Sequence, residues 1–108
     1  MEEFTINEML ELQRKFQKEY NRWSSICPEN GKNKLLWMVG EIGEVIDIVK
    51  KNGSQPVVEN AELRAHFVEE LADVLMYYNE ILLCYGITSN ELKRAYIEKA
   101  ERNMTRWK

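Results

Sequence analysis

The sequence lacks the cysteine and histidine patterns of disulfide-rich and thiolate-metal proteins, and it lacks the basic excess of nucleic-acid-binding proteins. Its 108 residues include two cysteines and a single histidine. Cys27 and Cys84 form neither a disulfide framework nor a zinc-binding spacing, and Cys84 continues an apolar helical stripe, which predicts a buried free thiol. The formal net charge of −3 lacks the basic excess that binding a nucleic-acid polymer requires. These absences argue against all three classes.

Long hydrophobic runs and a secretion leader are also missing. The longest apolar stretch, residues 81–87, is far shorter than the roughly 20 residues that span a membrane. The N-terminus, MEEFTINEML, is acidic and lacks the apolar segment of a signal peptide. Together with the free thiols, these features predict a cytoplasmic protein without a membrane segment.

The composition is that of one globular domain covering residues 1–108. Hydrophobic residues make up 44% of the chain and charged residues 31%, which separates it from disordered sequences. Apolar residues recur at steps of three and four, and no alternating strand pattern competes with this helical period. The sequence therefore predicts an all-α fold with four helices, which cover about residues 5–20 (or as far as 23), 33–52, 60–86 and 88–104.

Capping and turn residues set these bounds. Two capping boxes are predicted, at Thr5–Glu8 and Thr88–Glu91. Asn60 is placed to cap the third helix, and Gly53 to end the second as a left-handed residue. The remaining segments are predicted to be irregular, namely a loop with Pro28, Asn30 and Gly31 and a linker over residues 54–58.

The apolar surface predicted for the second and third helices is wider than one stripe. On each of them the main apolar arc and an acidic stripe lie on adjacent sides, so each helix is expected to contact more than one partner. One small subunit does not supply enough neighbours. The pattern therefore predicts a homodimer or homotetramer, with a site at or beside a helix-bundle core.

Two short acidic motifs are the most informative feature of the chain. Glu41 and Glu44 lie three residues apart in the second predicted helix, and Glu70 and Asp73 have the same spacing in the third. Each pair therefore shares one helical face, and steps of three and four lead from it to mostly apolar or aromatic residues. Four partly buried carboxylates need a counter-charge, which a divalent cation supplies.

The type of ligand indicates which cation this is. Carboxylate oxygens are hard donors and favour Mg²⁺, with Mn²⁺ as the alternative, over zinc or iron. A di-iron bundle is disfavoured because it requires Glu-x-x-His motifs, and the only histidine, His66, is not part of one. A single ExxE motif usually marks a solvated helical face, but two such motifs in mostly apolar stripes favour a metal site.

These motifs resemble those of a known family. The segments GEIGEV at residues 40–45 and EELADVL at residues 69–75 are similar to the ExxE and ExxD motifs of MazG-type all-α nucleoside triphosphate pyrophosphohydrolases, which include enzymes similar to dCTP pyrophosphatases. The likeness covers the second to fourth predicted helices. Some members carry an additional acid where this sequence has Gly40, a departure that also occurs in the branch similar to dCTP pyrophosphatases.

The resemblance implies Mg²⁺-dependent hydrolysis of a nucleoside triphosphate, such as a deoxynucleotide or a non-standard nucleotide, to the monophosphate and pyrophosphate. It also implies that the catalytic metal ligands are Glu41, Glu44, Glu70 and Asp73. On one face of the last helix, Lys99, Asn103 and Arg106 suit a polyphosphate and match the family's trailing pattern, although a solvated basic helix end is the alternative. Three further candidates for substrate contact are Lys34 for phosphate, and Trp37 and Tyr77 for the base or for core packing.

Two other functions stay open at this point. A phosphoribosyl-ATP pyrophosphohydrolase has a similar fold and similar acidic motifs, although its substrate suggests a more basic pocket. A non-catalytic helical dimerisation module, in which the acids form interhelical ion pairs, belongs to a different class of protein.

Overall fold

The computed structural model describes residues 3–20 and 25–106, and this part of the chain is all-α, as predicted. The helices are α1 (Ile6–Tyr20), α2 (Pro28–Asn52), α3 (Ser54–Glu59), α4 (Ala61–Cys84) and α5 (Ser89–Arg106). The prediction of four helices is therefore wrong by one short helix. Trp23, the later of the two predicted ends of the first helix, lies outside the described residues. Among the described helices, none is both long and apolar enough to cross a membrane.

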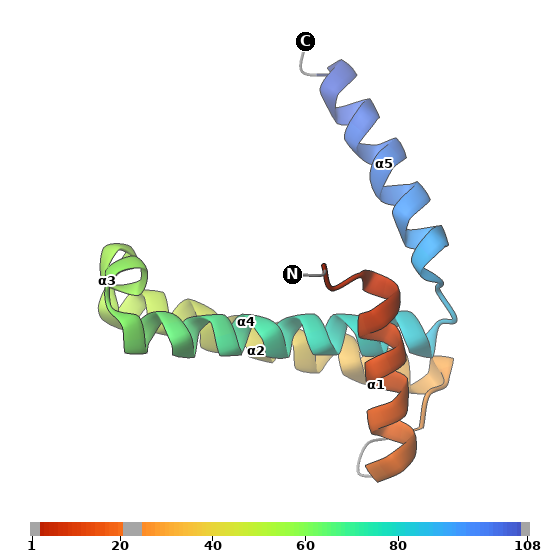
Figure 1. Cartoon of the computed structure of the whole chain (residues 1–108), viewed down its shortest axis with the longest axis horizontal. Helices are drawn as coiled ribbons and strands as arrows, with labels where there is room; N and C mark the ends of the chain where they lie inside the picture. The colour runs from red at the N-terminus through yellow and green to blue at the C-terminus, as the bar shows by residue number, and fades with distance from the viewer. Residues whose placement is uncertain (1–2, 21–24, 107–108) are drawn as a thin grey trace.

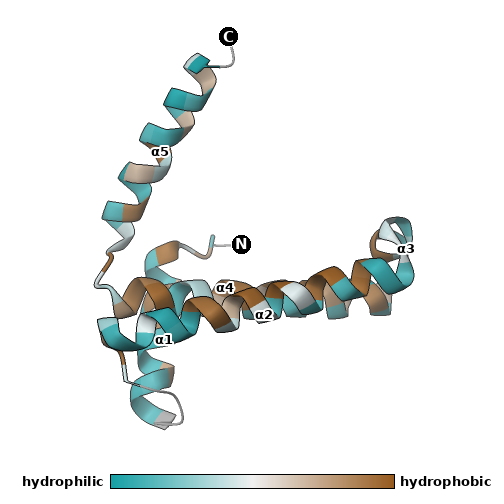
Figure 2. Cartoon of the chain, turned by 180° about the vertical axis from the view of Figure 1, so that it is seen from behind, coloured by the Kyte–Doolittle hydropathy of each residue, from teal (hydrophilic) through white to brown (hydrophobic). Residues whose placement is uncertain are grey.

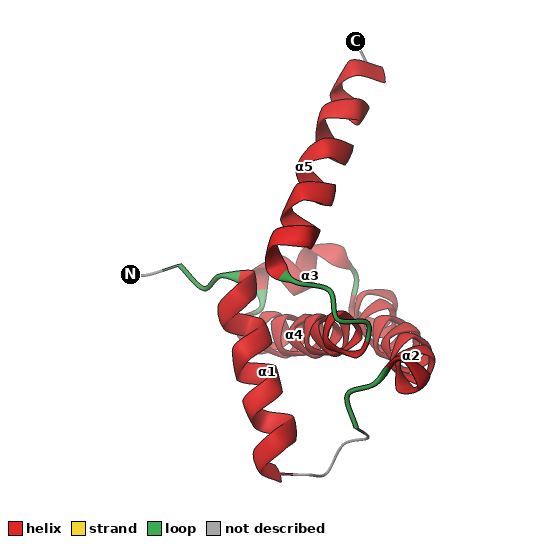
Figure 3. Cartoon of the chain, turned by 90° about the vertical axis from the view of Figure 1, so that its right-hand side faces the viewer, coloured by secondary structure: helices red, strands yellow, loops and turns green. Residues whose placement is uncertain are grey.

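An antiparallel pair, α2 and α4, forms the body of the molecule. The two helices run in opposite directions in Figure 1, and Figure 3 shows them side by side from one end. The short helix α3 joins them at one end of the pair, and α1 crosses them at the other end. The backbone of α5 approaches that of α1 and of no other described helix. The α2–α4 pair is therefore the scaffold on which both acidic motifs lie.

The predicted caps form hydrogen bonds at three helix starts. Glu8 N–H donates to Thr5 Oγ1 at 3.1 Å, and Thr5 N–H donates in return to Glu8 Oε1 at 2.9 Å. At the start of α4, Asn60 Oδ1 accepts from Leu63 N–H at 3.0 Å. The Thr88 hydroxyl accepts from Glu91 N–H at 3.1 Å where α5 begins. These bonds satisfy N–H groups that have no partner within the first turn of a helix.

The second helix begins earlier than the sequence indicated. Its predicted start near Asn33 is wrong, because α2 begins at Pro28. Proline is favoured at a first helical position, where an N–H group would have no partner. Gly31, which was predicted to lie in a loop, is buried within α2, and a side chain there would overlap the ring of Tyr85. Close packing, and not a turn, is what requires this glycine.

The predicted linker over residues 54–58 is also wrong, because this segment is the short helix α3. Pro56 is its third residue, a position whose N–H group a helix does not use. Val57 is only 6% exposed, so its burial favours an ordered segment. Gly53, between α2 and α3, has the predicted positive φ, at 87°, but its ψ of 156° differs from that of a left-handed helical residue.

The apolar core lies where α1, the end of α4 and the start of α5 meet. Leu10, Leu82 and Leu83 form its centre, and Ile87 and Leu92 pack against them. The adjacent Cys84 is buried and free, as predicted.

Much of the apolar surface of the α2–α4 pair is not covered by the chain itself. Figure 2 shows hydrophobic residues recurring along both helices, and exposed examples are Leu36, Val39 and Ile46 on α2 and Val68 and Met76 on α4. The radius of gyration is 16.4 Å, whereas a compact domain of this size has about 13 Å. A single copy of the chain is thus an open structure.

Candidate functional site

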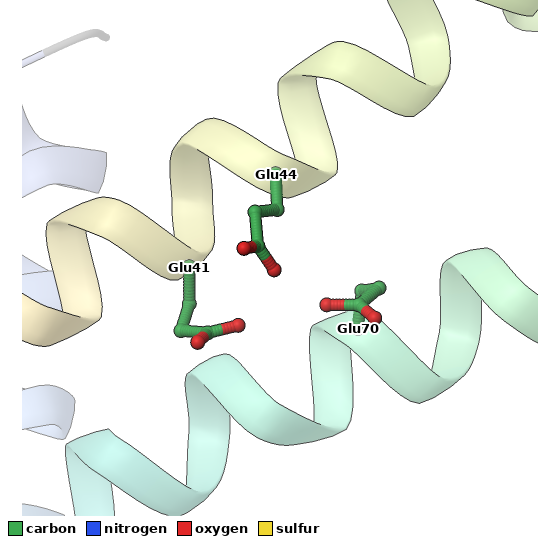
Figure 4. Close-up of side chains that lie close together, drawn as sticks. All are labelled: Glu41, Glu44 and Glu70. Atoms are coloured by element: carbon green, nitrogen blue, oxygen red, sulfur yellow. The ribbon is translucent and has the colours of Figure 1, made fainter.

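Three of the four predicted acids meet between α2 and α4. Glu41 and Glu44 lie one turn apart on α2, and Glu70 lies on α4. One carboxylate oxygen from each residue lies within 4.8 Å of those of the other two. Figure 4 shows the three side chains pointing toward one another in the space between the two helices. The acidic motifs are therefore brought together by the antiparallel pairing of their helices.

Asp73, the fourth predicted acid, lies beside this cluster. It is half-buried on α4, and its negative charge contributes to raising the pKa of Glu41 and of Glu70. Asp73 does not belong to the group whose oxygens converge within 4.8 Å. It is close enough to act electrostatically on the cluster without being part of it.

Burial and like charge both oppose ionisation of the cluster. Burial raises the pKa of Glu41, and the negative charges of Glu44 and Asp73 raise it further. Burial is also the largest cause of the raised pKa of Glu70, followed by repulsion from Asp73 and Glu44. A positive charge placed between these carboxylates would reverse both effects.

The cluster lacks an ion-pair partner in the described part of the chain, and the charge of His66 lowers the pKa of Glu70 by less than burial, Asp73 and Glu44 raise it. No lysine or arginine there forms an ion pair with Glu41, Glu44 or Glu70, and the buried Oε2 atom of Glu70 accepts no hydrogen bond. All the converging donors are carboxylate oxygens, which Mg²⁺ and Mn²⁺ prefer. The residues present therefore fit a hard divalent cation.

A cavity of about 630 Å³ adjoins the acids on the side of α1. Its volume lies within the range of roughly 300–1,000 Å³ typical of small-molecule sites. Glu41 and Asp73 form part of its wall, and Gln13 and Asn79 add polar groups. Most of the remaining lining is apolar, from Phe4, Met9, Leu12, Phe16, Leu75 and Met76.

The two predicted aromatic contacts lie one turn from the acids. The rings of Trp37 and Tyr77 meet edge to face, with centroids 6.4 Å apart and planes at 75°. Tyr77 lines the cavity, and its pKa is raised by burial and then by the charge of Glu41. Trp37 is 49% exposed and does not line the cavity. Tyr77 thus lies where the cavity meets the acids.

Lys34 is enclosed between the helices. Its side chain is completely buried, and its Nζ atom lies 2.9 Å from Glu80 Oε2 and 4.8 Å from the centre of the Trp37 ring. Gln13 Nε2 donates to Glu80 Oε1 at 3.0 Å. This arrangement does not present the Lys34 ammonium to a substrate. The sequence does not identify Glu80 or Gln13 as part of this site. The signal that could have found Glu80 is its position three residues after Tyr77, on the same face of the helix.

The predicted phosphate contacts on the last helix lie apart from the acids of the same chain. Lys99, Asn103 and Arg106 are exposed on α5, which extends away from the α2–α4 pair in Figure 1. Within one chain, the acidic and aromatic candidates and the buried Lys34 are therefore close together, whereas the three candidates on α5 are not.

The fold and the site define a class of all-α proteins in which an antiparallel helix pair carries converging carboxylates. A family model for the MazG nucleotide pyrophosphohydrolase domain matches residues 29–105, which include both acidic motifs and α5. The chain belongs to this family. No curated protein and no solved structure gives a significant match to it.

Proposed function

We propose that the protein hydrolyses a nucleoside triphosphate to the monophosphate and pyrophosphate, with Mg²⁺ as the cofactor and Mn²⁺ as a substitute. Glu41, Glu44 and Glu70 are assigned as metal ligands, and Asp73 completes the set. Membership of the MazG family points to this class of reaction. Its substrate is proposed to be a deoxynucleotide or a non-standard nucleotide.

The observation that carries this proposal is the convergence of carboxylates from two helices without an ion pair to any lysine or arginine of the described residues. The pKa values of Glu41 and Glu70 are raised, which indicates that joint ionisation of these acids is unfavourable without a cation. An array that opposes its own ionisation in this way is typical of a functional site. If the acids served only the fold, ion pairs with lysine or arginine would be expected instead.

The chemistry follows from the placement of these residues. A divalent cation held by Glu41, Glu44 and Glu70 would neutralise the charge of the polyphosphate and polarise the anhydride that is cleaved. Water adds to phosphorus, the anhydride bond between the α- and β-phosphates breaks, and pyrophosphate leaves. A carboxylate of the cluster that is not engaged as a ligand accepts the proton of the water. The cavity next to Glu41 and Asp73 has room for the nucleoside, with Tyr77 at its edge.

The phosphate contacts assigned to Lys99, Asn103 and Arg106 require a second copy of the chain. In the described structure the backbone of α5 does not approach that of α2 or α4, and two apolar side chains on the same helix, Tyr96 and Met104, are largely exposed. We infer a homodimer or homotetramer in which α5 of one chain lies over the acidic cluster of another. Their charges would then meet the pyrophosphate portion of the substrate.

Pyrophosphate release from a panel of nucleotides tests the proposal. The panel contains the standard NTPs and dNTPs, oxidised and methylated dNTPs, and phosphoribosyl-ATP, each with Mg²⁺, with Mn²⁺ and with EDTA. We expect pyrophosphate from at least one triphosphate, and none in EDTA. Preference for phosphoribosyl-ATP would support that alternative enzyme. No hydrolysis, together with a melting temperature that does not respond to Mg²⁺, would favour a dimerisation module.

A further inference from the structure

Four of the residue pairs that face each other along α2 and α4 form a regular ladder. Its first pair is Lys34 with Glu80, in contact at 2.9 Å, and its second is Trp37 with Tyr77, whose rings are 6.4 Å apart. Each further step of three or four residues along α2 is matched by an equal step backward along α4. The remaining pairs are Glu41 with Asp73 and Glu44 with Glu70, which interact through their charges.

Only the first pair of this ladder joins opposite charges. Lys34 is completely buried and Glu80 is 2% exposed. Both oxygens of Glu80 are engaged, one by Lys34 and the other by Gln13 of α1 at 3.0 Å. A buried ion pair loses its hydration on folding, so that it contributes little net stability, yet breaking it leaves an unpaired buried charge. Such a pair penalises every arrangement of the helices except the one that forms it.

The rest of the ladder does not oppose sliding of one helix along the other. Repulsion among the acids favours separation of their carboxylates, and an aromatic pair tolerates several geometries. A slide of one helical turn, about 5.4 Å, would move Lys34 opposite Tyr77 or Cys84 instead of Glu80. Both buried charges would lose their partner, and Gln13 would lose its acceptor.

The geometry points to Lys34, Glu80 and Gln13 as positioning residues that fix the register of α2 against α4, and thereby bring the metal-binding carboxylates opposite one another. Lys34 acts through Trp37, which lies below its ammonium at 4.8 Å and against Tyr77. The effect on metal binding rests on the proposed function. The register of the two helices does not, because it exists in the metal-free protein.

The test is the double variant K34M/E80L, because either single change would leave an unpaired buried charge and strongly destabilise the fold. Replacing a buried ion pair by apolar residues of similar size usually preserves or increases stability. The matched control, K32M/E62L, makes the same chemical changes at exposed positions of α2 and α4. On the metal-free full chain, nuclear Overhauser contacts between Trp37 and Tyr77 are measured. The affinity for Mn²⁺ is then measured by titrating the same protein and following electron paramagnetic resonance.

In K34M/E80L we expect a folded helical protein in which the Trp37–Tyr77 contacts are lost or split between several states. Its Mn²⁺ affinity is expected to fall roughly 10-fold or more, as when other supporting residues of metal sites are removed, while K32M/E62L matches the wild type. Intact ring contacts in K34M/E80L would overturn the inference, and so would wild-type Mn²⁺ affinity after those contacts are lost. If the wild type itself bound no Mn²⁺, the proposed metal site would be refuted, and the ring contacts would still decide the register.

Discussion

At the residue scale, the carboxylate of Glu44 converges with two other acids and forms no ion pair with a lysine or arginine of the described residues, although Lys51 and His66 line the same pocket. Glu41 precedes it by one turn on α2, and Glu70 faces it from α4, with one oxygen of each within 4.8 Å of the others. In the metal-free protein this arrangement destabilises the fold through like-charge repulsion. The same arrangement gives the site its affinity for a cation. Stability without metal and activity with metal should therefore respond in opposite directions when one acid is neutralised.

Glu44→Gln is expected to abolish hydrolysis and to leave the metal-free fold as stable as the wild type or more stable. The amide keeps the size of the side chain but removes a charged ligand, so we expect turnover to fall by at least about 100-fold, the upper end for loss of a group that supports a metal. Turnover with Mg²⁺ and thermal melts in EDTA measure the two effects. Glu69→Gln, on an exposed residue outside the cluster, is the control. Wild-type turnover in Glu44→Gln would show that Glu44 is not a ligand.

The raised pKa values of Glu41 and Glu70 predict how the metal-free protein responds to pH. Both native pKa values lie above the ordinary value of 4.5, so the native state holds these protons more tightly than the unfolded chain does. This contribution to stability is fully present below the unfolded pKa and is lost as pH rises through the native pKa. Melting temperatures in EDTA should therefore decline more steeply with rising pH in the wild type than in Glu41→Gln. Parallel curves would contradict the prediction, and Mg²⁺ should reduce the decline by favouring the ionised carboxylates.

At the element scale, α4 carries both Glu70 and Asp73, and a capping residue stabilises its first turn. Asn60 caps this helix through a 3.0 Å hydrogen bond to Leu63 N–H. Asn60→Ala is expected to lower the free energy of unfolding by about 1 kcal/mol, within a range of about 0.5–2 kcal/mol. Urea denaturation measures the loss. Asn60→Asp keeps an oxygen acceptor and serves as the control, so an equal loss in both variants would argue against a capping role.

The helix starts that the sequence predicts correctly depend on interactions between residues close together in the chain. Thr5 with Glu8, and Asn60, act through hydrogen bonds to residues three positions away, so the sequence alone contains both partners. Gly31 differs, because a glycine is required there by a residue distant in the sequence. A side chain at position 31 would overlap the ring of Tyr85, which follows α4. A short sequence window around Pro28 and Gly31 therefore suggests a loop, although long-range packing continues the helix through it.

The candidate site shows the same division between local and long-range information. Spacing alone groups Glu41 with Glu44, because these two share one helical face. It does not determine which residues of α4 lie opposite them, because that depends on the register of the two helices. For this reason the sequence suggested a substrate contact for Lys34, whereas the structure pairs Lys34 with Glu80.

At the scale of the whole molecule, the open shape of one chain predicts association. The radius of gyration of 16.4 Å and the exposed apolar residues of α2, α4 and α5 leave too much apolar surface in water for an isolated subunit. Light scattering coupled to size-exclusion chromatography should give a mass of two or four chains. The melting temperature should rise with protein concentration, because association stabilises the folded state by mass action. A monomer with a concentration-independent melting temperature would refute the oligomer.

Subunit mixing distinguishes an α5 that serves its own chain from one that serves a neighbour. A K99A/R106A chain and a Glu44→Gln chain should each be inactive alone. When the two are mixed and their subunits redistribute, a mixed dimer contains one site with the intact acids of the first chain and the intact α5 of the second. For random two-fold dimers about a quarter of the wild-type turnover should return. If α5 instead served its own chain, every site in the mixture would contain one damaged component and no activity would return. Recovery in the mixture, compared with each variant mixed with itself, therefore decides between the two arrangements.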